Sequence, residues 1–251
     1  MNDAHAKAAA DGELHLGSAR TDSVRSSVVK VVVPAIEEPA IVFFIGGAGG
    51  QEAFYFSGPN RNISDARRIL DTRESSLMKL GLYVAMDLNY NNVRSLNDLK
   101  KRVMARIPSK SAPVYIVGHS LGGWNGAHLC RILVDAGYNV VMLVTLDPVG
   151  RGTLVELASD IPFDPQAEPK AKVWINVRAV PSRPDRTDMI AMLGERWIVE
   201  SGPNANVEVD LNHADAEGLF LAKLANGMAV VDVVDASIKA CTSRSASQSA
   251  H

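Results

Sequence analysis

A serine stands in a glycine-rich turn directly after an apolar run, and its surroundings favour a nucleophile. The stretch "VYIVGHSLGG" (114–123) places Ser120 between Gly118 and Gly122. A tight turn between a strand and a helix lifts a serine hydroxyl clear of the sheet, and the small flanking residues let strand and helix come close. The helix N-terminus beneath the serine favours developing negative charge. Gly-x-Ser-x-Gly also arises by chance in turns, but this setting predicts that Ser120 is a nucleophile.

A serine hydroxyl needs a general base, and three histidines follow Ser120 in the chain. His128 lies about two turns into the following helix, roughly 12 Å along its axis at about 1.5 Å per residue, so its ring cannot reach back. His251 ends the sequence in a Ser-rich stretch. His213, in "VEVDLNHADAEG", follows a predicted strand and is therefore the predicted base, with a capping or surface role as the alternative. His119 is expected to line the site without serving as base.

An acid must orient the imidazole, and three aspartates follow predicted strands. Asp147 ends the apolar run "VVMLVTLDPVG", where a carboxylate is costly unless something uses it. Asp185 and Asp188, in "VPSRPDRTDMIAM", follow the next strand and have the same opportunity. We favour Asp147 as the orienting acid. The spacing also allows Asp185 or Asp188 in this role.

A developing oxyanion needs two donors, and the sequence offers one in each of two loops. The first is the backbone N–H of Leu121, directly after the serine. The second is expected from "FFIGGAGGQ" (43–51), where four glycines let the main chain approach a substrate carbonyl; Ala48 is the preferred donor and Gly47 the alternative. A phosphate loop is the other interpretation, but this loop lacks Lys-Ser/Thr and does not match Gly-x-Gly-x-x-Gly.

Strands and helices alternate along the chain in a way that places these residues at one edge of a sheet. Short apolar runs predict strands at 28–33, 40–45, 82–88, 114–118, 140–146, 172–180 and 207–211. Helical patterns occupy 64–81, 95–107, 123–137 and 214–228. The expected fold class is therefore α/β, a mostly parallel central sheet with helices on both faces, with the first two strands as a possible antiparallel edge. Active sites of such sheets collect at the carboxyl ends of the strands.

Composition limits the domain organisation and the class of partner. The 251 residues are 47% hydrophobic, enough for one catalytic domain over 27–240, with flexible tails expected at 1–26 and 241–251. The net charge of −2 and the absence of a Lys/Arg block make nucleic acid an unlikely partner. The two cysteines have no disulfide or zinc spacing, so no metal site is expected.

The N-terminal stretch lacks the apolar core of a signal peptide, and no later run is long enough for a transmembrane segment. The expected location is therefore cytoplasmic, and export without a cleaved signal is compatible with the same sequence. The oligomeric state is not predicted.

Together these residues resemble the α/β-hydrolase superfamily over about 28–231: a strand plus "GHSLGG", an upstream glycine-rich loop, then Asp and His in that order. "TLDPVG" is similar to the strand-end Leu-Asp-Pro of lipases that carry their acid one strand earlier than most relatives. The resemblance implies transfer of an acyl group to water through Ser120, His213 and Asp147, with no metal or organic cofactor. Gly-Gly-Ala-Gly-Gly replaces the usual His-Gly opening, which leaves the second oxyanion donor open.

The resemblance implies a carboxylic ester as substrate, expected to be a lipid or other acyl ester. A thioesterase or acyltransferase is the nearest alternative, and a hydrolase-like binding protein without turnover is another. No large cap domain is expected, because 150–171 and 187–200 hold only short helices and loops. In the second of these, the apolar residues could form a small lid, but core packing is favoured for Met189, Ile190, Met192, Leu193 and Trp197.

Overall fold

Six parallel strands form the sheet on which the candidate residues depend. The computed structural model describes residues 38–47, 62–93, 95–150 and 167–248. The strands run in the order β2-β1-β3-β4-β5-β6, and every neighbouring pair is parallel. Their bounds are β1 Ala40–Gly46, β2 Tyr83–Asn89, β3 Val114–His119, β4 Val140–Leu146, β5 Val173–Ala179 and β6 Ala205–Val209.

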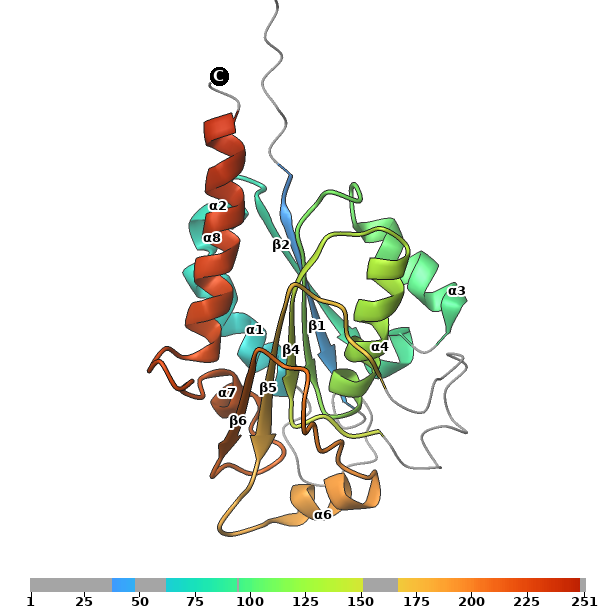
Figure 1. The fold of residues 1–251 in the computed structure, drawn as a ribbon, viewed down its shortest axis with the longest axis vertical. Helices are drawn as coiled ribbons and strands as arrows, with labels where there is room; N and C mark the ends of the chain where they lie inside the picture. Colours follow the sequence, from blue (N-terminus) through green and yellow to red (C-terminus); the bar gives the residue numbers. More distant parts are fainter. Residues whose placement is uncertain (1–37, 48–61, 94, 151–166, 249–251) are drawn as a thin grey trace, which may run out of the picture. The chain divides into compact units, whose positions relative to one another are not determined.

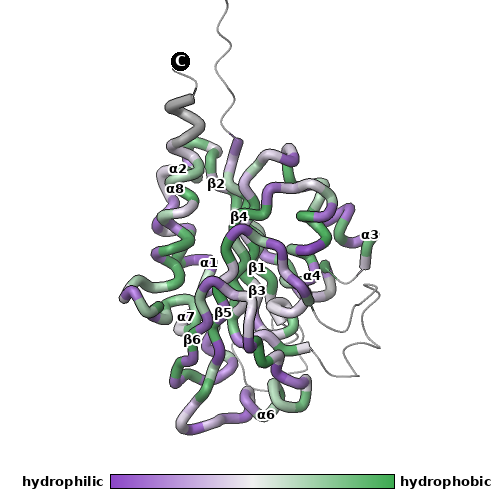
Figure 2. Tube along the Cα trace, viewed as in Figure 1, coloured by the Kyte–Doolittle hydropathy of each residue, from purple (hydrophilic) through white to green (hydrophobic). Residues whose placement is uncertain are grey.

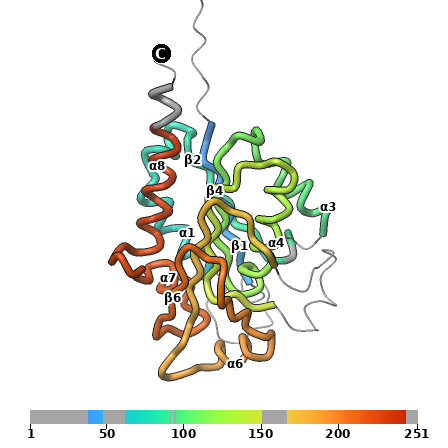
Figure 3. Tube along the Cα trace, in the orientation of Figure 1, coloured from blue at the N-terminus to red at the C-terminus, as the bar shows by residue number. Residues whose placement is uncertain are grey.

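Helices cover both faces of this sheet, which confirms the predicted α/β fold. In Figure 1, α4 and α3 lie on one side of the strands, while α1, α7 and α8 lie on the other. Figure 3 shows α1 beside α7 and α8, which come from the far end of the chain. The bounds are α1 Asn62–Arg73, α2 Ser75–Lys79, η2 Tyr90–Val93, α3 Leu96–Asp98, η3 Leu99–Val103, η4 Met104–Arg106, α4 Leu121–Asp135, α6 Arg186–Leu193, α7 Ala216–Phe220 and α8 Val230–Gln248.

The central strands are buried on both faces, as their uninterrupted apolar runs predict. Every residue of β1, β3 and β4 is buried, and Figure 2 shows hydrophobic colouring along the central strands. Two apolar clusters result, one on each face of the sheet. In one of them the three tryptophans pack together, with Trp197 in contact with both Trp124 and Trp174.

The predicted edge position of the opening strands is wrong for the second of them. Strand β1 lies inside the sheet and pairs in parallel with both β2 and β3. Both neighbours come later in the chain and run parallel to it, so β1 is not half of an antiparallel pair with the segment before it. The predicted strand at 28–33 falls outside the described residues, as does the predicted tail 1–26.

Three predicted helices are shorter or more broken than their patterns indicate. The pattern at 64–81 forms α1 and α2, and Gly81 follows them with a φ of 73°. The pattern at 95–107 forms α3, the π-helical turn η3 and the 3-10 turn η4. At 214–228 only α7 is helical, because the chain then turns back to form a bridge between Lys223 and Ala229.

Helix α8 runs to Gln248, past the boundary at residue 240 where a C-terminal tail was expected. The first residues beyond that boundary already make contacts: Thr242 is buried and its hydroxyl donates to the carbonyl of Ile238, and the hydroxyl of Tyr115 contacts Cys241. The Ser-rich composition concealed these packed residues. No helix in the described part of the chain is long and apolar enough to cross a membrane.

Candidate active site

Ser120 occupies a strained turn between β3 and α4. Its backbone has a φ of 58° and a ψ of −128°, a conformation that residues with a side chain rarely adopt. A Cβ at Gly118 would lie 2.3 Å from the carbonyl oxygen of Gly122, and a Cβ at Gly122 would lie 2.1 Å from that of Ile45. The predicted reason for the flanking glycines is therefore confirmed, because neither position has room for a side chain.

Three side chains from different parts of the sheet form one continuous hydrogen-bond chain. The hydroxyl of Ser120 donates to Nε2 of His213 at 2.9 Å, and Nδ1 of His213 donates to Oδ2 of Asp147 at 2.6 Å. This network assigns the proton of the neutral imidazole to Nδ1 and leaves Nε2 free to accept. All three residues are buried at the carboxyl ends of β3, β4 and β6. The structure thus brings the predicted nucleophile, base and acid together.

Asp147 is held in place from the neighbouring strand β5. Its backbone has a φ of 40°, its N–H donates to the carbonyl of Val177, and its Oδ1 accepts the N–H of Ala179 at 3.1 Å. Its Oδ2 also accepts Nε of Arg196 at 3.1 Å, beside the bond from His213. Because the carboxylate is bound on both oxygens, it presents one fixed acceptor to the imidazole ring.

Asp188 also contacts His213, but at the main chain and not at the ring. Its Oδ1 accepts the N–H of His213 at 3.0 Å and the guanidinium of Arg196 at 2.6 Å. Its Oδ2 accepts the side chain of Asn212 and the N–H of Asp185. Asp185 itself caps the N-terminus of α6. Of the three candidate aspartates, only Asp147 therefore has a hydrogen bond to the imidazole ring.

Hydrogen bonds also explain why Asp188 stays ionised although it is buried. Burial by itself would raise the pKa of its carboxyl group. The bonds from the Asp185 N–H, Asn212, Arg196 and the His213 N–H outweigh that effect and lower the pKa below its usual value.

His119 has a contact with the base that the sequence did not indicate. Its Nε2 donates to the main-chain carbonyl of His213 at 2.6 Å, and the two ring centroids lie 4.9 Å apart. Burial, and then the proximity of His213, lower the pKa of His119 to about 3, so it is neutral and acts as an N–H donor. His128 instead packs against Trp124, and His251 lies outside the described residues.

The glycine-rich loop after β1 begins directly against Ser120. A Cβ built on Gly47 would lie 2.6 Å from Cβ and 2.9 Å from Oγ of Ser120. Ala48, the preferred second oxyanion donor, lies outside the described residues. Leu121 is the first residue of α4, where a main-chain N–H has no partner within its own helix.

Helix α6 presents most of its apolar side chains to solvent. The expectation of core packing is confirmed for Trp197, which is 3% exposed. It is wrong for Met189, Ile190, Met192 and Leu193, the last of which is 80% exposed. The helix docks on the site through buried Asp188 and Ala191, so its apolar residues are left on the outside.

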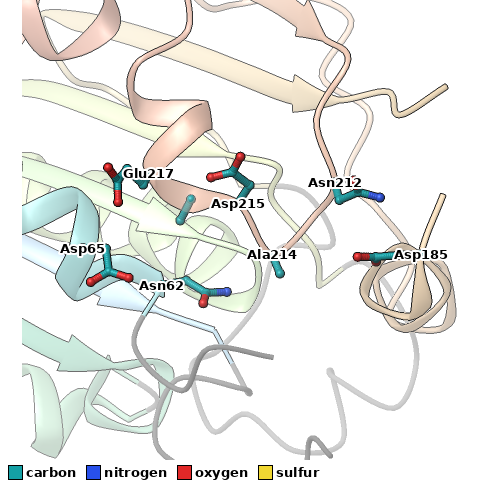
Figure 4. A pocket seen from close by; sticks show the side chains of 8 residues that line it. Asn62, Asp65, Asp185, Asn212, Ala214, Asp215 and Glu217 are labelled. Carbon is teal, nitrogen blue, oxygen red and sulfur yellow. The ribbon is translucent and has the colours of Figure 1, made fainter. Parts of the chain in front are cut away.

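A pocket of about 340 Å³ opens beside the loop that carries His213. Figure 4 shows Asn212 and Ala214, the two neighbours of His213 in the chain, on its wall. Four carboxylates belong to its lining, Asp65, Asp185, Asp215 and Glu217, and the described lining residues include no lysine or arginine. This negative lining disfavours an anionic group of a ligand at that place.

Asp188, Arg196 and His119 are the parts of this site whose contacts sequence reasoning did not foresee. The sequence marked Asp188 as a possible acid and His119 as a lining residue, and it gave no signal for Arg196. Its position in "GERWIVE" follows no strand and belongs to no spacing motif. Only the packing of the segment after α6 brings it to the site.

No family model and no curated protein sequence matches this chain. Among solved structures, it is similar to a hyperthermophilic esterase from the archaeon Pyrobaculum calidifontis, with 17% identity over 81% of this chain and 75% of that one and a TM-score of 0.45. The esterase domain of a Rhodothermus marinus protein is 13% identical over 81% of this chain and 88% of its own, with a TM-score of 0.42. YbtT, a type II thioesterase from the yersiniabactin NRPS/PKS biosynthetic pathway, is 13% identical over 74% and 91%, with a TM-score of 0.35.

The fold is established by the parallel sheet itself, with helices on both faces and Ser120 on the turn between β3 and α4. This is the arrangement of the α/β-hydrolase fold that the sequence resemblance implied.

Proposed function

We propose that this protein is a serine hydrolase that cleaves carboxylic esters through an acyl-enzyme intermediate. The observation that carries the proposal is the hydrogen-bond chain from Ser120 through His213 to Asp147, with the serine on a strained strand-to-helix turn. A serine hydroxyl alone is a poor nucleophile, and a neutral imidazole in hydrogen-bond reach makes it an effective one. Backbone strain of this kind concentrates at active sites, where it holds a functional group in position.

The reaction proceeds in two half-reactions. The Ser120 oxygen attacks the ester carbonyl carbon while Nε2 of His213 takes the hydroxyl proton, and the carbonyl electrons move onto oxygen. The tetrahedral intermediate collapses, the bond to the leaving alkoxide breaks, and His213 returns the proton to it. Water then attacks the acyl-enzyme with His213 as base, which releases the acid and restores Ser120. Asp147 stabilises the imidazolium that forms in each half-reaction.

Two main-chain donors are proposed to hold the oxyanion. One is the N–H of Leu121, which also lies at the positive N-terminal end of α4. The other comes from the loop after β1, with Gly47 or Ala48 as donor. The close approach of Gly47 to Ser120 supports this assignment, because a donor must lie beside the nucleophile to reach the oxygen of the carbonyl under attack.

The proposed substrate is a lipid or other acyl ester. The exposed apolar side chains of α6 support an apolar acyl group, because they lie on the helix whose Asp188 contacts the base. The acidic pocket beside the His213 loop supports an uncharged or cationic group and disfavours an anionic one.

Hydrolysis of paired oxygen and thio esters tests this proposal and separates it from the thioesterase alternative. We expect turnover of p-nitrophenyl esters of graded acyl length, with a higher kcat/KM than for thioesters of the same acyl groups. Ser120→Ala should abolish turnover, whereas Ser76→Ala, at an exposed position on α2, should leave it unchanged. Preference for thioesters would identify a thioesterase. A folded wild-type protein that turns over neither class would support a binding protein instead.

A further inference from the structure

Arg196 lies between the two carboxylates that contact the base. Its Nε donates to Asp147 at 3.1 Å and its NH2 group donates to Asp188 at 2.6 Å. Both aspartate side chains are only 1% exposed, while the arginine side chain is 18% exposed. One guanidinium thus bridges Asp147, which binds the ring of His213, and Asp188, which binds the main-chain N–H of His213.

The backbone around Arg196 is fixed to the same segment that carries Asp147. Arg196 forms an antiparallel bridge with Val149, and the N–H of Trp197 donates to the carbonyl of Pro148 at 2.9 Å. Buried Trp197 packs on the other tryptophans and anchors the strand-like segment. The guanidinium therefore reaches both carboxylates from a rigid support, and its fork geometry suits two acceptors in a way that a lysine does not.

His213 is consequently held from three directions. Asp147 binds its ring, Asp188 accepts its N–H, and His119 donates to its carbonyl. A carbonyl and an N–H fixed by separate side chains leave the backbone of the base little freedom to move. Arg196 links two of these three supports, and a change at Arg196 reaches the imidazole through both aspartates.

We propose that Arg196 is a positioning residue that fixes His213 through Asp147 and Asp188 and offsets the negative charge of the second carboxylate. This inference rests on the proposed function. Two buried carboxylates beside one imidazole would favour its protonated form, and a protonated imidazole cannot accept the proton of Ser120. The positive charge of the bridging guanidinium offsets this effect of the two carboxylates.

Among the described residues, four charged or titratable groups surround His213. Asp147 follows β4, Asp188 lies on α6, His119 ends β3, and Arg196 follows α6. His119 is neutral well above pH 3, because burial and the proximity of His213 lower its pKa to about 3. The two aspartates and Arg196 therefore set the electrostatic balance at the ring.

The test is the pH dependence of kcat/KM for a p-nitrophenyl ester in wild type and in variants. Arg196→Met should move the acid limb of the pH profile to higher pH, by on the order of one unit, because it removes a positive charge that offsets the two carboxylates beside the imidazole. Arg196→Lys should keep the limb near its wild-type position while kcat falls, because an ammonium cannot hold both acceptors. Arg102→Met, which removes an exposed charge on η3, should change neither.

A charge-balanced double variant separates electrostatics from structure. Arg196→Met with Asp188→Asn removes one charge of each sign, and the acid limb should return toward the wild-type position. A role in folding alone would not reverse the limb in this way. Circular dichroism and thermal unfolding establish that each variant is folded.

The proposal would be overturned if folded Arg196→Met kept the acid limb of wild type. It would also be overturned if the acid limb of the double variant lay at the same pH as that of Arg196→Met. If wild type hydrolyses no ester at all, it is the proposed function that fails. If wild type is active and only the limb does not move, the function stands and the role of Arg196 fails.

Discussion

Replacement of Asp147 by asparagine should disable the base without removing it. The carboxylate accepts Ala179 N–H on Oδ1 and both His213 Nδ1 and Arg196 Nε on Oδ2. An asparagine that keeps the bond to Ala179 turns its NH2 group toward two donors. The imidazole can relieve this conflict only by moving its proton to Nε2, where it faces Ser120 and cannot accept. A rotated amide instead sets NH2 against the N–H of Ala179.

The expected loss of activity has two causes: the imidazole no longer holds its proton on Nδ1, and the imidazolium loses the negative charge of Asp147. A triad acid changed to its amide lowers turnover by about 10⁴-fold, which is about 5 kcal/mol of transition-state stabilisation. Asp188→Asn should lower kcat/KM by at most about 10²-fold, the scale of a displaced catalytic group. Its bond to His213 is to the main-chain N–H and not to the ring. The assay is kcat/KM for a p-nitrophenyl ester, with circular dichroism to verify folding.

The reverse ranking would refute the reasoning. If Asp188→Asn is the crippling change and Asp147→Asn the mild one, then Asp188 is the orienting acid during catalysis. The hydrogen-bond distances seen here would then not represent the working arrangement.

Two further predictions concern the loop beside the nucleophile and a buried acid remote from it. Gly47→Ala should lower kcat/KM by at least about 10²-fold, because its Cβ would lie 2.6 Å from Cβ and 2.9 Å from Oγ of Ser120 and a displaced reacting group costs about that much. A fully active variant would show that this loop does not approach the serine. Burial, and then Asp235, raise the pKa of Glu74 to about 7 from 4.5, so the stability it gives below pH 4.5 is lost as the pH rises through 7. Glu74→Gln should remove this loss, so that the free energy of unfolding in denaturant changes less between pH 5 and pH 8 than it does in wild type. An equal change in both proteins would contradict the prediction.

The sheet and the central residues of the site were accessible from sequence for a physical reason. Strands buried on both faces must be apolar throughout, and a polar residue at the end of such a strand therefore stands out. Ser120 and Asp147 follow apolar runs, His213 follows the alternating strand β6, and the structure places the three together. Only the contacts could separate Asp147 from Asp188, because both follow strands.

The parts that sequence did not predict depend on contacts between distant segments. Arg196 reaches the site because its segment bridges to Val149, a pairing that no local pattern encodes. The apolar residues of α6 were expected in the core because their spacing suits burial, but the helix docks through Asp188 and leaves them outside. Helix α8 extends past residue 240, where Thr242 is buried, although its composition is that of a tail.

Covalent labelling by a fluorophosphonate tests most directly whether Ser120 is an activated nucleophile. The reagent forms a stable adduct only with a serine whose proton is taken by a nearby base. We predict a single adduct on the peptide that contains Ser120, lost in Ser120→Ala and strongly slowed in Asp147→Asn. Folded protein that remains unlabelled, or an adduct on another serine that survives Ser120→Ala, would contradict the assignment of this site.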